Sequence, residues 1–168
     1  MKYWITLCLV FATGAMAAPR SQGTPGEFDF YVLSLSWSPT FCLTHPDNEQ
    51  CSGKGYGFVL HGLWPQYAKG GWPASCNPQS SLSREELDKG AALFPTRSLL
   101  KHEWAKHGTC SGLEPLAYLE KTDAALGVVA VPTQLQPFNT PPSLPASEIE
   151  ALFRESNPRM GNHGVAVI

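Results

Sequence analysis

"FVLHGLWPQ", residues Phe58–Gln66, combines an apolar run with residues that favour a turn. The apolar residues predict a short buried strand over about residues 56–60. Gly62 and Pro65 predict that this strand runs directly into a turn. His61 would therefore lie where a buried strand gives way to a turn. Taken alone, such a histidine is best interpreted as a satisfied core residue.

A second stretch, "KHEWAKHGTC" (residues 101–110), holds two histidines, a glutamate and two lysines. On a helix, Glu103 and His107 are four residues apart and share a face, so their side chains can touch. His102 and His107 are five residues apart and project about 140° from each other. They cannot bind one zinc ion as the histidines of an HExxH motif do. His102 and Lys106 flank the face that carries Glu103 and His107.

This arrangement of charged side chains is suited to proton transfer. A carboxylate at Glu103 is expected to raise the pKa of His107 and to fix the orientation of its ring. His102 and Lys106 can stabilise negative charge that develops on a substrate. The alternative is an ordinary solvated helix face of mixed charge. Counting His61, three of the chain's five histidines lie in these two stretches, which favours a functional site.

Trp64 lies three positions after His61 in the first stretch. Its indole offers a flat apolar surface on which a nucleic-acid base could stack, a contact worth about 1–3 kcal/mol. The alternative is that Trp64 is an ordinary buried aromatic residue. The sequence leaves both interpretations open.

Residues 1–17 have the features of a secretory signal peptide. Lys2 supplies a positive charge, a mostly apolar run follows, and the small-residue sequence AMA stands at positions 15–17. The apolar run is too short to span a bilayer. We therefore expect residues 1–17 to be removed on export, although cleavage could equally follow Ala18. The remaining residues 18–168 are expected to form a single domain.

Loss of the signal peptide would remove one of the 12 basic residues and none of the 14 acidic ones, leaving a net charge of about −3. Such a charge argues against a histone-like or operator-type DNA binder. Four cysteines would remain, and an even number in an exported chain indicates two disulfides. Spacing alone does not choose among the possible pairings. A zinc site is the alternative, although the chain has no C-x-x-C motif.

The expected helices and strands do not alternate regularly, which favours the α+β class over a doubly wound sheet. Ser83 and Glu86 form a predicted capping box for the first of four expected helices, and Ser147 opens another for the last. Gly108 is placed to terminate the second helix. A strand buried on both faces is expected over 28–38, followed by a loop that carries Cys42 and Cys51. The four helices are expected from about 84 to before Pro95, from 97 or 98 to Gly108, over 114–126, and from about 147 to before Pro158. Residues 131–146 should be irregular, and a strand should begin at 164–168.

The sequence HGLWP followed by KHEWAKHGTC resembles the two active-site segments of the T2 family of ribonucleases. Order, residue types and separation all match, and the similarity extends from about Phe28 to about Pro158 through WSPTFC and WPASC. The resemblance implies an α+β fold with a central, mostly antiparallel sheet and helices packed on it. It also implies an endoribonuclease that needs no metal or other cofactor.

The resemblance implies cleavage of single-stranded RNA by transphosphorylation, in which the 2′-hydroxyl attacks the adjacent phosphorus and a 2′,3′-cyclic phosphate forms. DNA lacks this nucleophile and is not an expected substrate. By motif position, His61 would be the general acid, His107 the general base, and Glu103 would orient or polarise this site. The expected substrate-binding residues are His102, Lys106 and Trp64, the first two at the phosphate.

The resemblance further implies the disulfides Cys42–Cys51 and Cys76–Cys110. We expect a secreted or periplasmic protein that acts as a monomer, with no membrane association after loss of the signal peptide. Relatives usually continue past the position of Ile168 with more strands, so we expect a C-terminally short form of the fold. The alternative functions are a catalytically inactive T2-like fold that binds RNA or a partner, and a zinc hydrolase.

Overall fold

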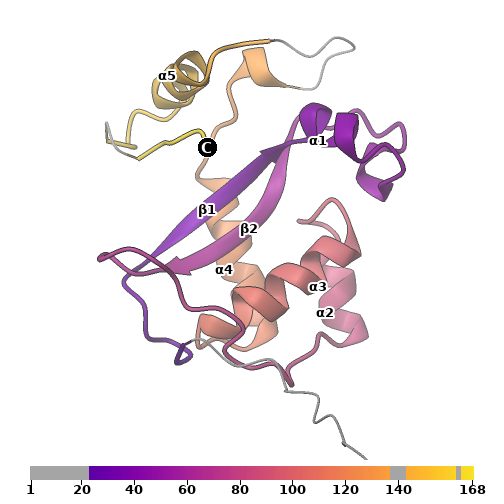
Figure 1. Ribbon diagram of the computed structural model, residues 1–168, viewed down its shortest axis with the longest axis vertical. Helices are drawn as coiled ribbons and strands as arrows, with labels where there is room; N and C mark the ends of the chain where they lie inside the picture. Colours follow the sequence, from indigo (N-terminus) through magenta and orange to yellow (C-terminus); the bar gives the residue numbers. More distant parts are fainter. Residues whose placement is uncertain (1–22, 137–142, 162–163) are drawn as a thin grey trace, which may run out of the picture.

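Two antiparallel strands run through the centre of the structure, and helices pack on them (Figure 1). The strands are β1 (Phe30–Trp37) and β2 (Phe58–Gln66), and helix α4 (Pro115–Gly127) lies behind them in the view of Figure 1. This architecture confirms the α+β class. The computed structural model describes residues 23–136, 143–161 and 164–168, so the expected signal peptide lies outside the described residues.

The remaining helices lie on either side of the hairpin. Helices α2 (Arg84–Gly90) and α3 (Arg97–Lys106) lie together below it, and α5 (Ala146–Ser156) lies above it (Figure 1). Phe153 of α5 contacts Phe58 at the start of β2, with 5.2 Å between ring centroids. No helix in the described ranges is long and apolar enough to cross a bilayer.

A β-bulge in the hairpin leaves His61 without a cross-strand partner. Ser34 of β1 faces Gly62, whereas the next residue, Leu35, faces Leu60. An extra residue in one strand bends that strand and redirects its side chain. The bulge therefore sets the direction in which the His61 imidazole leaves the strand.

The predicted turn at Gly62 and Pro65 is wrong, because β2 continues to Gln66. Glycine and proline usually interrupt strands, but they are tolerated at bulges and on edge strands. Gly62 directly follows the bulge, and β2 pairs only with β1 among the described residues. The strand therefore accommodates both residues without a turn.

One face of β1 packs against the core. Tyr31 and Leu33 contact the buried clusters, whereas Phe30 and Val32 are 47% and 37% exposed. The prediction that both faces of this strand are buried is therefore wrong for the described chain. The sequence of a strand shows which residues share a face, but it does not show whether a second layer of structure covers that face.

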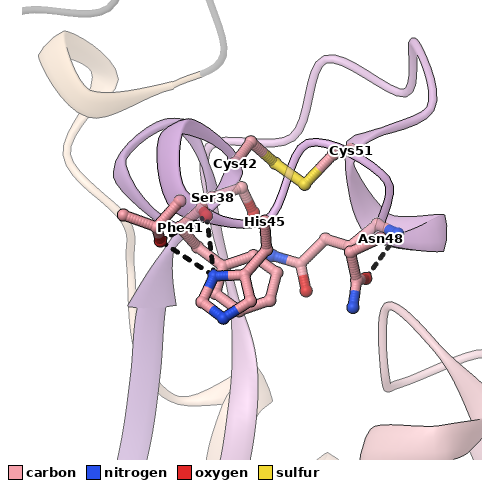
Figure 2. The surroundings of a disulfide bond; sticks show 8 residues. Ser38, Phe41, Cys42, His45, Asn48 and Cys51 are labelled. Atoms are coloured by element: carbon pink, nitrogen blue, oxygen red, sulfur yellow. Dashed lines mark hydrogen bonds between the residues drawn. A yellow bond between two sulfur atoms is a disulfide. The ribbon is translucent and has the colours of Figure 1, made fainter.

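The segment predicted as a loop around Cys42 and Cys51 contains a short helix and a 3-10 turn. These are α1 (Ser38–Thr44) and η1 (Glu49–Cys51). The disulfide Cys42–Cys51 joins them, as Figure 2 shows. At the end of α1, the His45 backbone N–H donates to the carbonyl of Phe41 at 3.0 Å. The His45 ring stacks on the Phe41 ring at 4.4 Å (Figure 2). This segment is too short for helical periodicity to be seen in the sequence.

Side-chain caps fix the starts of α2 and α3. The Ser83 hydroxyl accepts a hydrogen bond from the Glu86 N–H at 3.3 Å, and the Glu86 carboxylate accepts one from the Ser83 N–H at 2.5 Å. This confirms the predicted capping box. At α3, the Thr96 hydroxyl accepts from the Leu99 N–H at 3.1 Å. Each cap satisfies a backbone donor that the helix itself leaves unpaired.

Two C-terminal predictions are wrong. Ser147 does not cap α5, because the helix begins one residue earlier, after Pro145. Residues 164–168 form no strand in the described chain; instead, the Val167 N–H donates to the Glu150 carboxylate of α5 at 3.1 Å. A strand needs a neighbouring ladder, and no strand of the described residues lies beside this segment. The segment predicted to be irregular contains the 3-10 turn η3 (Thr133–Leu135), and residues 137–142 lie outside the described residues.

The core lies between β2 and helices α2, α3 and α4. One buried cluster consists of Leu60, Phe94, Leu100 and Leu119, and a second consists of Leu63, Trp104 and Tyr118. The Tyr118 hydroxyl donates to the Leu63 carbonyl at 2.9 Å, which links α4 to β2. Gly108 follows α3 at the predicted position. A β-carbon there would collide with the Trp104 ring, so glycine is needed for close packing.

Truncation of Leu100 should destabilise the fold strongly. Its side chain is fully buried (0% exposed), and Leu100→Ala should lower the free energy of unfolding by about 2–5 kcal/mol through lost burial and a residual cavity. Urea denaturation followed by circular dichroism measures this loss. Leu43→Ala is the matched control, because Leu43 is 83% exposed. Equal losses in the two variants would contradict this core assignment.

Candidate active site

Glu103 is a buried carboxylate held between two side chains of β2. It is 1% exposed, and its Oε1 lies 3.3 Å from Nε2 of His61. Its Oε2 accepts a hydrogen bond from the indole N–H of Trp64 at 2.6 Å. Residues that are 39 or more positions apart in the sequence thus meet because α3 packs on β2. A buried charge requires such partners.

Gly62 gives the Glu103 carboxylate room against β2. A β-carbon at this position would overlap the carboxylate and the indole nitrogen of Trp64. The colliding atoms are side-chain ends rather than backbone, so a larger residue would displace the carboxylate from its partners. Glycine here serves close approach of a side chain to the strand.

Trp64 also contacts both imidazoles. Its ring stacks on the ring of His107, with 5.0 Å between centroids and 25° between planes. The ring of His61 meets it edge-on at 5.6 Å and 85°. Trp64 therefore links the two histidines through ring contacts. The predicted role of Trp64 as a base-stacking surface stays a prediction, and one face of its ring lies against His107.

His107 lies at the C-cap of α3 and is 3% exposed. Its backbone N–H donates to the Glu103 carbonyl at 2.9 Å, which fixes the last helical turn. Its side-chain Nδ1 is buried and has no hydrogen-bond partner within the part of the chain that the structure describes. The predicted contact between the Glu103 and His107 side chains is replaced by two others. Glu103 turns to His61 and Trp64, and His107 packs on Trp64.

The pKa of His107 is lowered to about 4: burial is the largest cause, and the positive charges of Lys106, His102 and His61 act in the same direction. The negative charge of Glu103 acts in the opposite direction but is outweighed. The prediction that Glu103 raises this pKa is therefore right for the pair alone and wrong for the net shift. His107 is neutral near pH 7. The sequence could not reveal this because the shift depends on burial.

The pKa of Glu103 is lowered. Burial acts to raise it, but the hydrogen bonds from His61 and Trp64 and the positive charges of His107 and His61 together outweigh burial. The carboxylate is therefore ionised at neutral pH. The site thus holds a buried anion, a neutral imidazole, and a second imidazole that is 38% exposed.

Lys106 and His102 lie on the same helix as Glu103 and close enough to influence the pKa of His107 electrostatically. His102 is exposed and Lys106 is half-buried, so both can meet an anion that approaches from solvent. The Lys106 carbonyl accepts a hydrogen bond from the Ser75 N–H at 2.8 Å. Ser75 has a φ of 51°, which is uncommon for a residue with a β-carbon.

The disulfide Cys76–Cys110 anchors the loop after β2 to the turn η2 (Gly108–Cys110), which follows His107 directly. Both pairings, Cys76–Cys110 and Cys42–Cys51, are the ones that the resemblance implies. Together with the Ser75 hydrogen bond, this crosslink holds the end of α3 in place. The His107 backbone is thus restrained by covalent and hydrogen-bonded contacts.

The sequence model of the ribonuclease T2 family matches residues 28–144 of this chain. The chain belongs to the ribonuclease T2 family. The match covers every residue of the candidate site, from His61 to His107. Within the described ranges, no group of three or more His, Cys, Asp or Glu side chains is arranged to hold a metal ion.

Curated relatives and solved structures agree with the T2 family assignment. A ribonuclease of Aeromonas hydrophila is 48% identical over 118 residues, which cover 67% of this chain and 51% of that protein. Ribonuclease I of Escherichia coli is 30% identical over 136 residues, covering 55% of this chain and 51% of that protein. The chain thus spans about half the length of the curated relatives it matches.

The fold matches that of solved T2-type ribonucleases. The structure of RNase NT in complex with 5′-AMP superposes with a TM-score of 0.61 at 26% identity, covering 77% of this chain and 73% of that one. An RNase-related protein from Calystegia sepium gives the same TM-score and identity, covering 77% and 75%. These likenesses extend over most of each chain.

Three contributors to the site were not predicted from the sequence. These are the Trp64 N–H that binds Glu103, the room that Gly62 leaves, and the Ser75 N–H that binds Lys106. In the sequence, Gly62 and Trp64 follow the strand histidine His61 closely. This spacing is a weak signal for the roles of Trp64 and Gly62. Nothing in the sequence marks Ser75.

The depressed pKa of His107 should make stability depend on pH. Between the ordinary histidine pKa of about 6.5 and about 4, the unfolded state binds more protons, so the free energy of unfolding falls as pH falls through this window. The loss should reach about 2–3 kcal/mol at pH 4.5 relative to pH 7. Urea denaturation at both pH values measures it.

His107→Gln is the matched variant for this test, because it removes the titrating group while keeping a polar side chain. Its stability should fall less over the same interval. Carboxyl groups outside the site contribute equally in both proteins, whereas the pKa of Glu103 itself responds to the charge of His107. An identical pH dependence in the wild type and the variant would rule out His107 as the source.

Proposed function

We propose that this chain is an endoribonuclease that cleaves single-stranded RNA by transphosphorylation without a metal ion. The observation that carries the proposal is the pairing of two unlike imidazoles in one site. His107 is buried and has a pKa of about 4, and His61 lies beside the ionised Glu103. General acid–base catalysis needs one neutral and one protonated group. Membership of the ribonuclease T2 family supports the same reaction.

In the proposed reaction, the substrate 2′-hydroxyl attacks phosphorus while neutral His107 takes the hydroxyl proton. Because Nδ1 of His107 is buried, the proton passes to Nε2. The O2′–P bond forms, the P–O5′ bond breaks, and protonated His61 donates a proton to the departing 5′-oxygen. The products are a 2′,3′-cyclic phosphate and a 5′-hydroxyl.

Glu103, Lys106 and His102 assist this step in different ways. The Glu103 carboxylate, 3.3 Å from Nε2 of His61, orients that imidazole and balances its positive charge. Lys106 and His102 hold the phosphate and stabilise the negative charge of the pentacoordinate transition state. DNA is excluded as a substrate because it has no 2′-hydroxyl.

The proposed location is outside the cytoplasm, in the medium or the periplasm. Two disulfides occur in the described chain, and disulfides persist mainly in oxidising compartments. The signal-peptide features of residues 1–17 also support export. The proposed enzyme acts as a monomer.

Cleavage of a defined substrate tests the proposed reaction. In EDTA, the wild-type protein should cleave a DNA oligonucleotide that contains one ribonucleotide, only on the 3′ side of that ribonucleotide, and leave a 2′,3′-cyclic phosphate. His61→Ala and His107→Ala should each lose at least about 100-fold in rate, the usual contribution of a general acid or base. Mass spectrometry identifies the product.

His45→Ala is the control for these variants, because His45 is exposed at the end of α1, and it should retain wild-type activity. Activity that EDTA abolishes and zinc restores would favour a zinc hydrolase. A folded protein that binds the oligonucleotide without cleaving it would favour the inactive, RNA-binding alternative.

The pH dependence of kcat/KM should be bell-shaped. The rate rises with pH through about 4 as His107 loses its proton and becomes the active base. It falls at higher pH once the general acid no longer carries the proton that it must donate. Kinetics on a dinucleoside phosphate between pH 3 and 9 measure both limbs. A rate that stays flat between pH 4 and 8 would count against the two-histidine mechanism.

A further inference from the structure

Trp64 joins the three central side chains of the candidate site. Its indole N–H binds Glu103, its ring face lies on His107, and its ring meets the edge of His61. It comes from β2, whereas Glu103 and His107 come from α3 and its C-cap. A change at this one side chain therefore reaches both proton-transfer groups.

The hydrogen bond from Trp64 fixes the rotation of the Glu103 carboxylate. At 2.6 Å it is short and charge-assisted, and such bonds are the stronger ones in proteins. With Oε2 held by the indole, Oε1 is presented to Nε2 of His61 at 3.3 Å. The neighbouring hydroxyl of Tyr118 donates to the Leu63 carbonyl rather than to this carboxylate. Trp64 is thus the residue that orients Glu103.

The ring of Trp64 has a separate effect on His107. The two rings are stacked at 5.0 Å and 25°, and His107 is only 3% exposed. Removing the indole would admit water to the imidazole. Burial is the largest cause of the low pKa of His107, so the stack helps to keep this imidazole neutral.

We propose that Trp64 is a positioning residue of this site, which aims the Glu103 carboxylate at His61 through its N–H and shields His107 through its ring. This inference deepens the proposed function and rests on it for the catalytic readout. It does not require Trp64 to touch the substrate. The charged and titratable groups that face the site are Glu103, His102 and Lys106 from α3, His61 from β2, and Tyr118 from α4.

Two variants separate the two effects of Trp64. Trp64→Phe keeps an aromatic ring but removes the N–H, so kcat should fall about tenfold or more while KM stays within about twofold, as expected for loss of a hydrogen bond to a charged group. Trp64→Ala removes the ring as well. The pKa of His107, followed by NMR without substrate, should then rise from about 4 towards its ordinary value of about 6.5. In Trp64→Phe it should stay near 4.

Trp37→Phe is the matched control. Trp37 is a half-buried strand residue that packs on Phe58 with 4.9 Å between ring centroids, and its kcat and His107 titration should match the wild type. A kcat for Trp64→Phe equal to that of the control would overturn the proposal. A higher KM with unchanged kcat would also overturn it, because that result indicates a substrate-stacking role.

A measurement on the wild-type protein covers the case in which either variant fails to fold. The indole N–H of Trp64 should resonate well downfield and exchange slowly with water, and Glu103→Gln should move it upfield. A resonance typical of a free indole that exchanges rapidly would sink the proposal. These NMR readouts need no substrate. If the wild type cleaves no RNA, the proposed function fails while the positioning role is still tested.

Discussion

The buried charge of Glu103 is the constraint on which the site depends. Transfer of an unpaired carboxylate from water into a protein interior costs several kcal/mol, so the fold must bring partners to it. Both partners come from β2, on either side of Gly62, and the carboxylate comes from α3. The docking of α3 on β2 therefore has to satisfy an electrostatic requirement as well as an apolar one.

The remaining features keep that docking accurate. The bulge directs the His61 side chain, and the room left by Gly62 admits the Glu103 carboxylate. The disulfide Cys76–Cys110 holds the turn after His107. None of these features carries out the proposed chemistry. They set the positions of groups that exchange protons, and proton transfer is sensitive to displacements well below the size of a side chain.

Much of the helical structure could be predicted from the sequence, because capping residues and prolines act locally. The capping box at Ser83 is an example. The T2-type motifs also indicated which side chains would gather. The bulge at His61 and the net pKa shift of His107 could not be predicted in this way. Both depend on which residue of a distant element lies opposite, and burial reverses the sign that the Glu103–His107 pair alone suggests.

Gly62 has a consequence for how the molecule tolerates sequence change. Every other amino acid carries a β-carbon, and the collision with the carboxylate and indole begins at that atom. Alanine should therefore be nearly as harmful as a large residue, and a saturation scan of this position should give a step rather than a gradient. Because the colliding groups are side-chain ends, the hairpin itself can persist. A substitution at position 62 should thus reduce activity and stability together, because it separates a buried charge from its partners.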